Sequence, residues 1–220
     1  MRLAAILAAL LFASSAGADE SFEAAKAKFE AAKVKAEQGN GESQAVLGAR
    51  YASGNGVPQD YGEAAKWYRK SAGQGIALAQ TALAQLYAEG EGVPQDYAEA
   101  AKWFRMAAEQ GFAPAQTTLA RMYLEGRGVP QDDSEAVTWL REAAKQGNAT
   151  AQGALATMLA TGQGIPVDRV QAYAWLLLVM PEYREKAEPL LTRLTGQMTP
   201  KQLAEAQKLA AEYFEKYKAK

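Results

Sequence analysis

The chain repeats itself with a period of 36 residues, and this period constrains its fold more than any other feature. The motif GVPQD or its variant GIPVD occurs at residues 56–60, 92–96, 128–132 and 164–168. A tryptophan recurs at the same interval, as Trp67, Trp103, Trp139 and Trp175. Self-similar units of about 20 to 50 residues are typical of stacked arrays, in which each unit buries its apolar surface against its neighbours. The sequence therefore predicts a repeat architecture.

Each unit carries the pattern of two helices. In the first, Leu47, Gly48 and Tyr51 fall at helical spacing, with a small residue that lets two helix backbones approach closely. In the second, Ala64 and Trp67 begin an apolar stripe at steps of three and four residues. Each helix is followed by glycine, so the predicted unit is helix, turn, helix, turn.

The GxGVPxD segment between the two helices supplies a turn and a helix cap. Gly54 suits the left-handed conformation that ends a helix, and Asp60 followed by Glu63 predicts a capping box. The equivalent pairs are Asp96 with Glu99, Asp132 with Glu135, and Asp168 with Gln171. A phosphate-binding loop would follow a strand, and a metal loop would need several converging oxygen ligands. We therefore expect neither a cofactor nor a metal at this motif.

Composition narrows the possible functions. The 24 basic and 25 acidic residues nearly balance, so we expect no nucleic-acid partner. The chain has no cysteine and no histidine, which excludes a Ser-His-Asp triad, a thiolate nucleophile and an ordinary zinc site. Carboxylate pairs and Ser-Lys or Tyr-Lys arrangements stay open. We predict no catalytic residues.

The N-terminus has the pattern of a secretory signal. Arg2 precedes an apolar run from Leu3 to Ala13, and Ala16 and Ala18 form an A-x-A arrangement. The run is too short to span a bilayer comfortably, so a retained anchor is the lesser alternative. We expect cleavage after Ala18, no integral membrane span afterwards, and export to a periplasm or, as the second possibility, to the exterior.

The repeat motifs resemble two related families. LGARY at residues 47–51 is similar to the L-G-x-x-Y element of tetratricopeptide repeats. The longer period and the YxxGxGVPxDxxxAxxW spacing resemble the Sel-one-like repeat family. A fourth, weaker copy has Leu159 in place of the tyrosine and Ile165 in place of the valine. The resemblance implies an all-α fold, an α/α superhelical solenoid of helix-turn-helix repeats, whose members mostly act as scaffolds for protein partners.

The predicted organisation has four parts. They are a signal peptide at 1–18, an N-terminal capping helix at 19–39, four repeats at 40–180 and a C-terminal helical cap at 181–220. Thr199, Pro200 and Gln202 predict the start of the last helix. Lys216, Lys218 and Lys220 leave open the alternative that this helix contacts a membrane surface or a partner.

Function is expected on the exposed face of the first helices, because the other faces are committed to packing. If Leu47, Gly48 and Tyr51 face inward, positions 45, 49, 52 and 53 form the adjoining stripe. In later units this first-helix stripe presents Thr81, Gln85, Glu89, Thr117, Arg121, Glu125, Thr157 and Thr161. The candidate partner-binding residues are Gln85, Glu89, Arg121, Glu125, Thr117 and Thr157. The resemblance to tetratricopeptide repeats places this stripe on the concave side.

These residues are short, mixed and polar, which suits a protein partner that presents an extended peptide or a loop. We predict an exported interaction scaffold. The alternative is a cell-wall-related enzyme with peptidoglycan or β-lactam chemistry, suggested by exported, cysteine-rich relatives, from which the lack of cysteine separates this chain. A simpler alternative for any one residue is that it is only solvated.

Two further sets of recurring polar residues are interpreted as structural and not as binding residues. Arg69, Arg105 and Arg141 follow the tryptophans of the second helices, where such charges solvate an outer face or bridge to a neighbouring helix. A basic stripe for an acidic partner is the other interpretation. Gln44, Gln80, Gln116 and Gln152 precede the core leucines and are predicted to bond to backbone at the turn between repeats.

Overall fold

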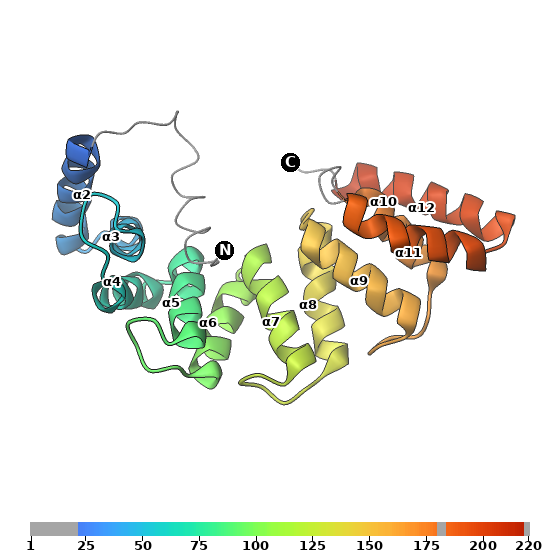
Figure 1. The fold of residues 1–220 in the computed structure, drawn as a ribbon, viewed down its shortest axis with the longest axis horizontal. Helices are drawn as coiled ribbons and strands as arrows, with labels where there is room; N and C mark the ends of the chain where they lie inside the picture. Colours follow the sequence, from blue (N-terminus) through green and yellow to red (C-terminus); the bar gives the residue numbers. More distant parts are fainter. Residues whose placement is uncertain (1–21, 180–183, 218–220) are drawn as a thin grey trace. The chain divides into compact units, whose positions relative to one another are not determined.

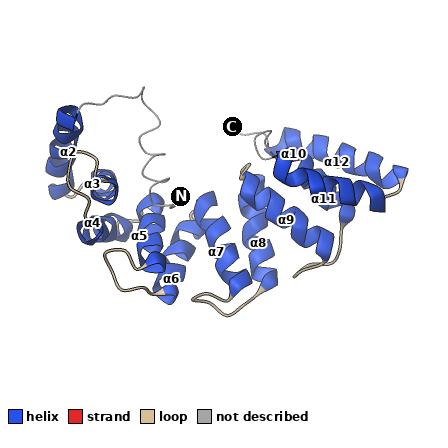
Figure 2. Cartoon of the chain, viewed as in Figure 1, coloured by secondary structure: helices blue, strands red, loops and turns tan. Residues whose placement is uncertain are grey.

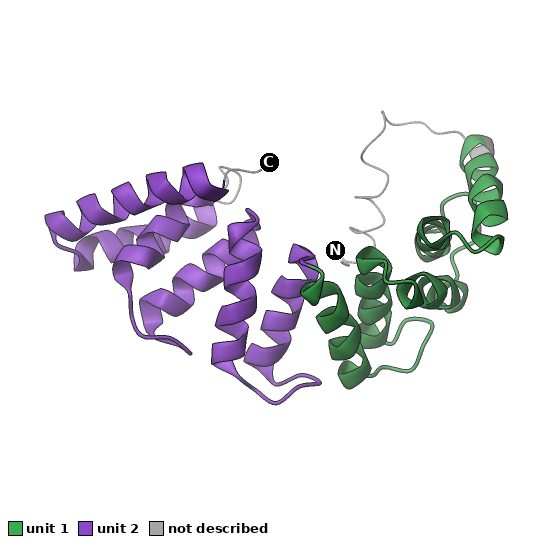
Figure 3. Ribbon diagram, turned by 180° about the vertical axis from the view of Figure 1, so that it is seen from behind, with its two compact units in different colours: residues 1–110 green, residues 111–220 purple. Residues whose placement is uncertain are grey.

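The computed structural model describes residues 22–179 and 184–217, and its regular secondary structure in these ranges is entirely helical (Figures 1 and 2). The predicted signal peptide lies outside the described residues. The chain divides into two compact units, residues 1–110 and 111–220 (Figure 3). None of the helices in the described ranges is long and apolar enough to cross a membrane.

Among its described residues, the first unit has five helices that pack against one another in chain order. They are α2 (Phe22–Glu37), α3 (Gly41–Ser53), α4 (Tyr61–Gly73), α5 (Ala77–Glu89) and α6 (Tyr97–Glu109). A buried cluster, made largely of alanines together with Leu83 and Leu86, joins α3, α4 and α5. Small side chains suit this packing because they let successive helix pairs stack closely.

The second unit continues the same order and ends in two further helices. Its elements are α7 (Ala113–Glu125), α8 (Asp133–Lys145), α9 (Ala149–Thr161), α10 (Arg169–Leu178), α11 (Arg184–Gln197) and α12 (Pro200–Tyr217). Helices α7 to α10 pack in sequence, and α12 then packs extensively on α10, whereas α11 touches α9 and α10 over a smaller area. In both units the prediction of helix-turn-helix repeats with terminal capping helices is confirmed.

The small residue in the middle of α3 makes room for a side chain. A methyl group added at Gly48 would lie 2.7 Å from Cδ1 of Tyr68, whose ring is buried against this glycine. The predicted close approach therefore occurs, but the space is taken by an aromatic ring and not by a helix backbone. Burial raises the pKa of the Tyr68 phenol, which stays neutral.

The turn and cap predicted for the repeated motif are present, with one correction. Gly54 ends α3 in the left-handed conformation at φ 74°, and Asp60 accepts a bond of 3.0 Å from the Glu63 N–H. The reciprocal half of the predicted capping box is absent here. The Asp60 N–H donates instead to the Tyr51 carbonyl at 2.9 Å, and the Glu63 carboxylate pairs with Lys66. The aspartate thus caps one helix and ties its loop to the preceding one.

The second glycine of the motif has a role that the turn alone does not explain. Gly92 has φ 70°, and a methyl group there would overlap the Tyr61 carbonyl and lie 2.5 Å from the Gly62 nitrogen. In the other unit, a methyl group added at Gly164 would lie 2.5 Å from the carbonyl carbon and oxygen of Asp133. These glycines let the loop of one repeat pack directly on the start of the second helix of the preceding repeat.

The recurring glutamines bond to backbone as predicted. The Nε2 groups of Gln44, Gln80 and Gln152 donate to the carbonyls of Ala36, Ala72 and Ala144, at 3.0, 3.2 and 3.2 Å. Each of these carbonyls belongs to the last turn of the preceding helix. Within the first unit, the Gln80 side-chain oxygen also accepts a bond of 2.7 Å from Gln110. The column therefore links successive helices through buried polar contacts.

We expect Gln80→Leu to lower the free energy of unfolding by about 1–3 kcal/mol, because it leaves the Ala72 carbonyl and the Gln110 amide without their partner. Gln95→Leu is the control. Gln95 donates to the Ala88 carbonyl at 2.9 Å, but the bond is exposed and water can replace it, so the expected loss is about 0.5 kcal/mol or less. Urea unfolding followed by circular dichroism measures both; equal losses would contradict the assigned role.

Both ends of the array are covered by packed helices. Phe29 of α2 meets Tyr51 of α3 edge to face, with ring centroids 5.4 Å apart. At the other end, Trp175 of α10 packs against Tyr213 and Tyr217 of α12, at 4.6 and 5.6 Å. Burial in this cluster raises the pKa of the Tyr213 phenol. The last helix begins as predicted, since the Thr199 N–H donates to the Gln202 side chain at 2.9 Å.

Candidate functional site: the first-helix stripe

In the first unit, most of the first-helix stripe is buried, which corrects the predicted exposure. Ala45 and Ala49 are 2% and 0% exposed and belong to the core cluster shared by α3, α4 and α5. Thr81 and Gln85 are buried as well, at 2% and 7%. The Thr81 hydroxyl donates to the Ala77 carbonyl at 2.9 Å.

Two candidate residues of the first unit bind each other. The Gln85 amide donates a hydrogen bond to the Glu89 carboxylate one turn later on α5. Gln85 is therefore a poor partner-binding candidate, because both its burial and its hydrogen bond tie it to its own helix. Glu89 lies at the exposed end of α5 and keeps its candidate role as a prediction.

In the second unit, the same stripe is open to solvent. Arg121 on α7 is exposed, and within residues 22–179 and 184–217 its guanidinium makes neither an ion pair nor a hydrogen bond. Glu125, one turn later, is exposed and pairs with Arg127 at 3.1 Å. Thr157 occupies the same register position on α9 as Arg121 on α7 and is exposed too. This half of the stripe offers one unengaged cation beside an ion pair.

The threonines of the stripe use their hydroxyls locally. Thr117 is half-buried and donates to the Ala113 carbonyl at 2.9 Å, and Thr157 donates to the Gly153 carbonyl at the same distance. Both hydroxyls are therefore engaged within their own helices. Arg121 and Glu125 contribute charge to the stripe.

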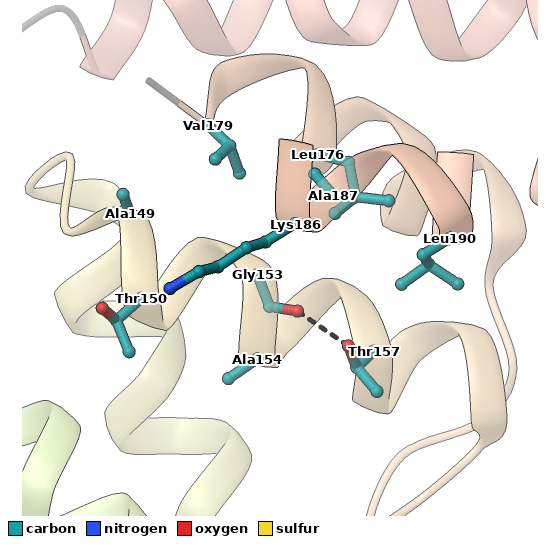
Figure 4. A pocket seen from close by; sticks show the side chains of 10 residues that line it. All are labelled: Ala149, Thr150, Gly153, Ala154, Thr157, Leu176, Val179, Lys186, Ala187 and Leu190. Carbon is teal, nitrogen blue, oxygen red and sulfur yellow. Dashed lines mark hydrogen bonds between the residues drawn. The ribbon is translucent and has the colours of Figure 1, made fainter. Parts of the chain in front are cut away.

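At α9 the stripe opens into a pocket of about 340 Å³ (Figure 4). Its lining comes from α9, from the end of α10 and from α11. The lining residues are Ala149, Thr150, Gly153, Ala154, Thr157, Leu176, Val179, Lys186, Ala187 and Leu190. Helical spacing in the sequence predicts Thr157 on the stripe but does not predict the pocket. Its signals were Gly153, where earlier repeats carry alanine or threonine, and the unusually apolar fourth repeat.

Of the arginines on the second helices, Arg69 bridges to a neighbouring helix, as the architectural interpretation predicts. Arg69 on α4 donates to the Tyr87 hydroxyl on α5 at 2.8 Å. Lys70 lies over the Trp67 ring, 4.2 Å from its centroid. In the part of the chain that the structure describes, acidic side chains do not gather in groups of three or more that would suit a metal ion. The stripe of the second unit is therefore the favoured candidate surface.

Comparisons with known proteins agree with this architecture. A family model described as the Sel1 repeat matches residues 41–76, 77–112, 113–148 and 149–178. A crystal structure of a protective antigen from uropathogenic Escherichia coli, displaying an SLR fold, matches with a TM-score of 0.80 and 35% identity over 98% of this chain and 44% of that one. A Sel1 repeat protein from Oxalobacter formigenes matches with a TM-score of 0.72 and 36% identity, over 77% of this chain and 49% of that one.

The chain thus spans less than half the length of either of these two solved relatives. No curated protein matches it significantly.

Proposed function

The chain belongs to the Sel1 repeat family, and from that premise we propose that it is a non-catalytic scaffold that binds a protein partner on the first-helix stripe of its second unit. The observation that carries the proposal is the exposure of Arg121, Glu125 and Thr157 on helices whose other faces are buried. Proteins with this repeat generally act in protein interaction. A stripe freed from packing is the part of such a helix that remains available for binding.

The chemistry of the stripe indicates the kind of partner. Arg121 has no partner of its own among the described residues, so its guanidinium is available for a carboxylate or for backbone carbonyls. Arginine is also among the residue types enriched at energetically important interface positions. The short threonines leave room for a partner's main chain. An extended segment or loop with an acceptor or acidic group opposite Arg121 fits this surface best.

We place the protein outside the cytoplasm, with the periplasm as the first location and secretion as the second. The support is the apolar run and A-x-A arrangement in the first 18 residues. The Escherichia coli relative is described as a protective antigen, a description that suits a protein reached by the immune system. Location is tested by fractionating cells that express the full chain and by sequencing the mature N-terminus, which is expected to begin after Ala18.

The test of function is partner recovery with Arg121→Ala. Loss of a central interface arginine typically costs about 2 kcal/mol or more, so recovery in a pull-down is expected to fall about thirtyfold at limiting concentration. The free energy of unfolding is expected to change by about 0.5 kcal/mol or less, because the side chain is exposed and makes neither a hydrogen bond nor an ion pair within the described residues.

Arg69→Ala is the matched control, because Arg69 is also exposed but bridges two helices of the other unit. It should recover the partner as the wild type does. Recovery that survives Arg121→Ala and is lost with Arg69→Ala would move the site to the second-helix face. Gln85 is left unchanged, because its side chain is buried and bonded to Glu89, so that its loss would confuse loss of stability with loss of binding.

A further inference from the structure

We propose that the pocket between α9, α10 and α11 takes one apolar side chain of the partner together with a neighbouring carboxylate, which pairs with Lys186. The proposal rests on the proposed function and extends it from the exposed stripe to a specific subsite. It names the chemistry of the bound segment, an aliphatic or aromatic residue next to an acidic group.

The floor of the pocket is a helix face that is covered in the second and third repeats. Ala82 on α5 and Thr118 on α7 occupy the same register position as Ala154 on α9 and are 4% and 8% exposed. Ala154 is only half-buried. A methyl group added at Gly153 would meet nothing within 4 Å. The surface of α9 is thus built for packing but left open, because α11 covers it only in part.

The walls are apolar and well fixed. Leu176 and Val179 are 3% and 5% exposed, so their positions are held by surrounding contacts. Ala187 and Leu190 of α11 also line the pocket. The Thr157 hydroxyl already donates to the Gly153 carbonyl, so it does not require a hydrogen-bond acceptor from the ligand. A volume of about 340 Å³ lies at the lower end of the range of small-ligand sites and admits one bulky side chain.

A single cation sets the charge of the occupant. In Figure 4 the Lys186 side chain extends from α11 over the pocket in the direction of α9. Within the two described ranges, Lys186 forms no ion pair with any carboxylate. An apolar floor beneath an unpaired ammonium group is complementary to an amphiphilic anion. A purely apolar helix would leave this charge without a partner as it is desolvated.

The test uses purified protein and N-acetyl-phenylalanine, which carries the ring and the carboxylate in one molecule. Amide NMR spectra are expected to show saturable shifts at Gly153, Ala187 and their neighbours. N-acetyl-phenylalanine amide, which lacks the charge, should bind about threefold more weakly, since a partly exposed ion pair contributes about 0.2–1 kcal/mol. Lys186→Glu should abolish this preference, and Lys201→Glu, an exposed lysine on α12 that does not line the pocket, should preserve it.

Filling the pocket provides a second variant that leaves the fold intact. Gly153→Leu places a side chain into the open space and is expected to remove probe binding. Gly196→Leu is the matched control, because Gly196 also lies in a helix with nothing within 4 Å of an added methyl group and does not line the pocket. Absence of saturable shifts, or shifts that survive Gly153→Leu, would overturn the proposal.

The two hypotheses fail separately. Partner recovery that is lost with Arg121→Ala but unchanged with Gly153→Leu overturns the pocket and leaves the proposed function standing. Recovery that persists with Arg121→Ala counts against the stripe, even when the probe binds. Recovery that falls with both variants and stays normal with Gly196→Leu supports both.

Discussion

Gly92→Ala is expected to lower the free energy of unfolding by about 3 kcal/mol. Two costs combine at this position. The backbone has φ 70°, which costs a residue with a Cβ atom about 1–2 kcal/mol. The new methyl group would also overlap the Tyr61 carbonyl and force the loop away from α4, and such overpacking costs about 1–3 kcal/mol or more.

Gly75→Ala separates these two costs. Gly75 has φ 85°, but an added methyl group there meets nothing within 4 Å, so only the backbone cost applies and the expected loss is about 1 kcal/mol. Both variants are measured by urea unfolding with circular dichroism. Losses of equal size would show that the loop does not pack on the start of α4 as the structure has it.

The glycines of the repeated motif show which features the sequence could predict and which it could not. The turn at Gly54 and the cap at Asp60 are encoded within a few residues, so the motif alone was sufficient to place them. The packing of Gly92 on Tyr61 joins segments of different repeats. A recurring glycine in a loop is compatible with either role, and only the positions of the neighbouring helices distinguish them.

The same limit explains the correction at the stripe. Gln85 and Arg121 occupy equivalent positions of consecutive repeats, yet the Gln85 side chain is buried and the Arg121 side chain is exposed. Helical spacing assigns a residue to a face of its own helix, but burial depends on which neighbours cover that face. The repeat pattern could therefore predict which residues occupy equivalent positions. It could not predict in which repeats those positions are buried and in which they are exposed.

The pocket was beyond prediction for a related reason. Its walls on α9 and α10 come from the fourth repeat, but Lys186 and Leu190 come from α11, a helix outside the repeat pattern. No periodicity predicts how a terminal helix packs on the array. The sequence did contain an indication, since the fourth repeat departs from the others in Gly153 and in its apolar second helix.

The central claim is that a partner binds the first-helix stripe of the second unit, and position-specific photo-crosslinking in living cells tests it most directly. A photoreactive phenylalanine derivative is introduced singly at positions 121, 157 and 69. All three native side chains, Arg121, Thr157 and Arg69, are exposed, so each variant is expected to fold. The substituted chain keeps its N-terminal segment, so that any export takes place before irradiation.

We expect one adduct of the same mass at positions 121 and 157, identified as the same protein by mass spectrometry, and none at position 69. The contrast should be large, because crosslinking requires the probe to lie within the interface. An adduct at position 69 with none at 121 or 157 would contradict the claim and place the partner on the second-helix face.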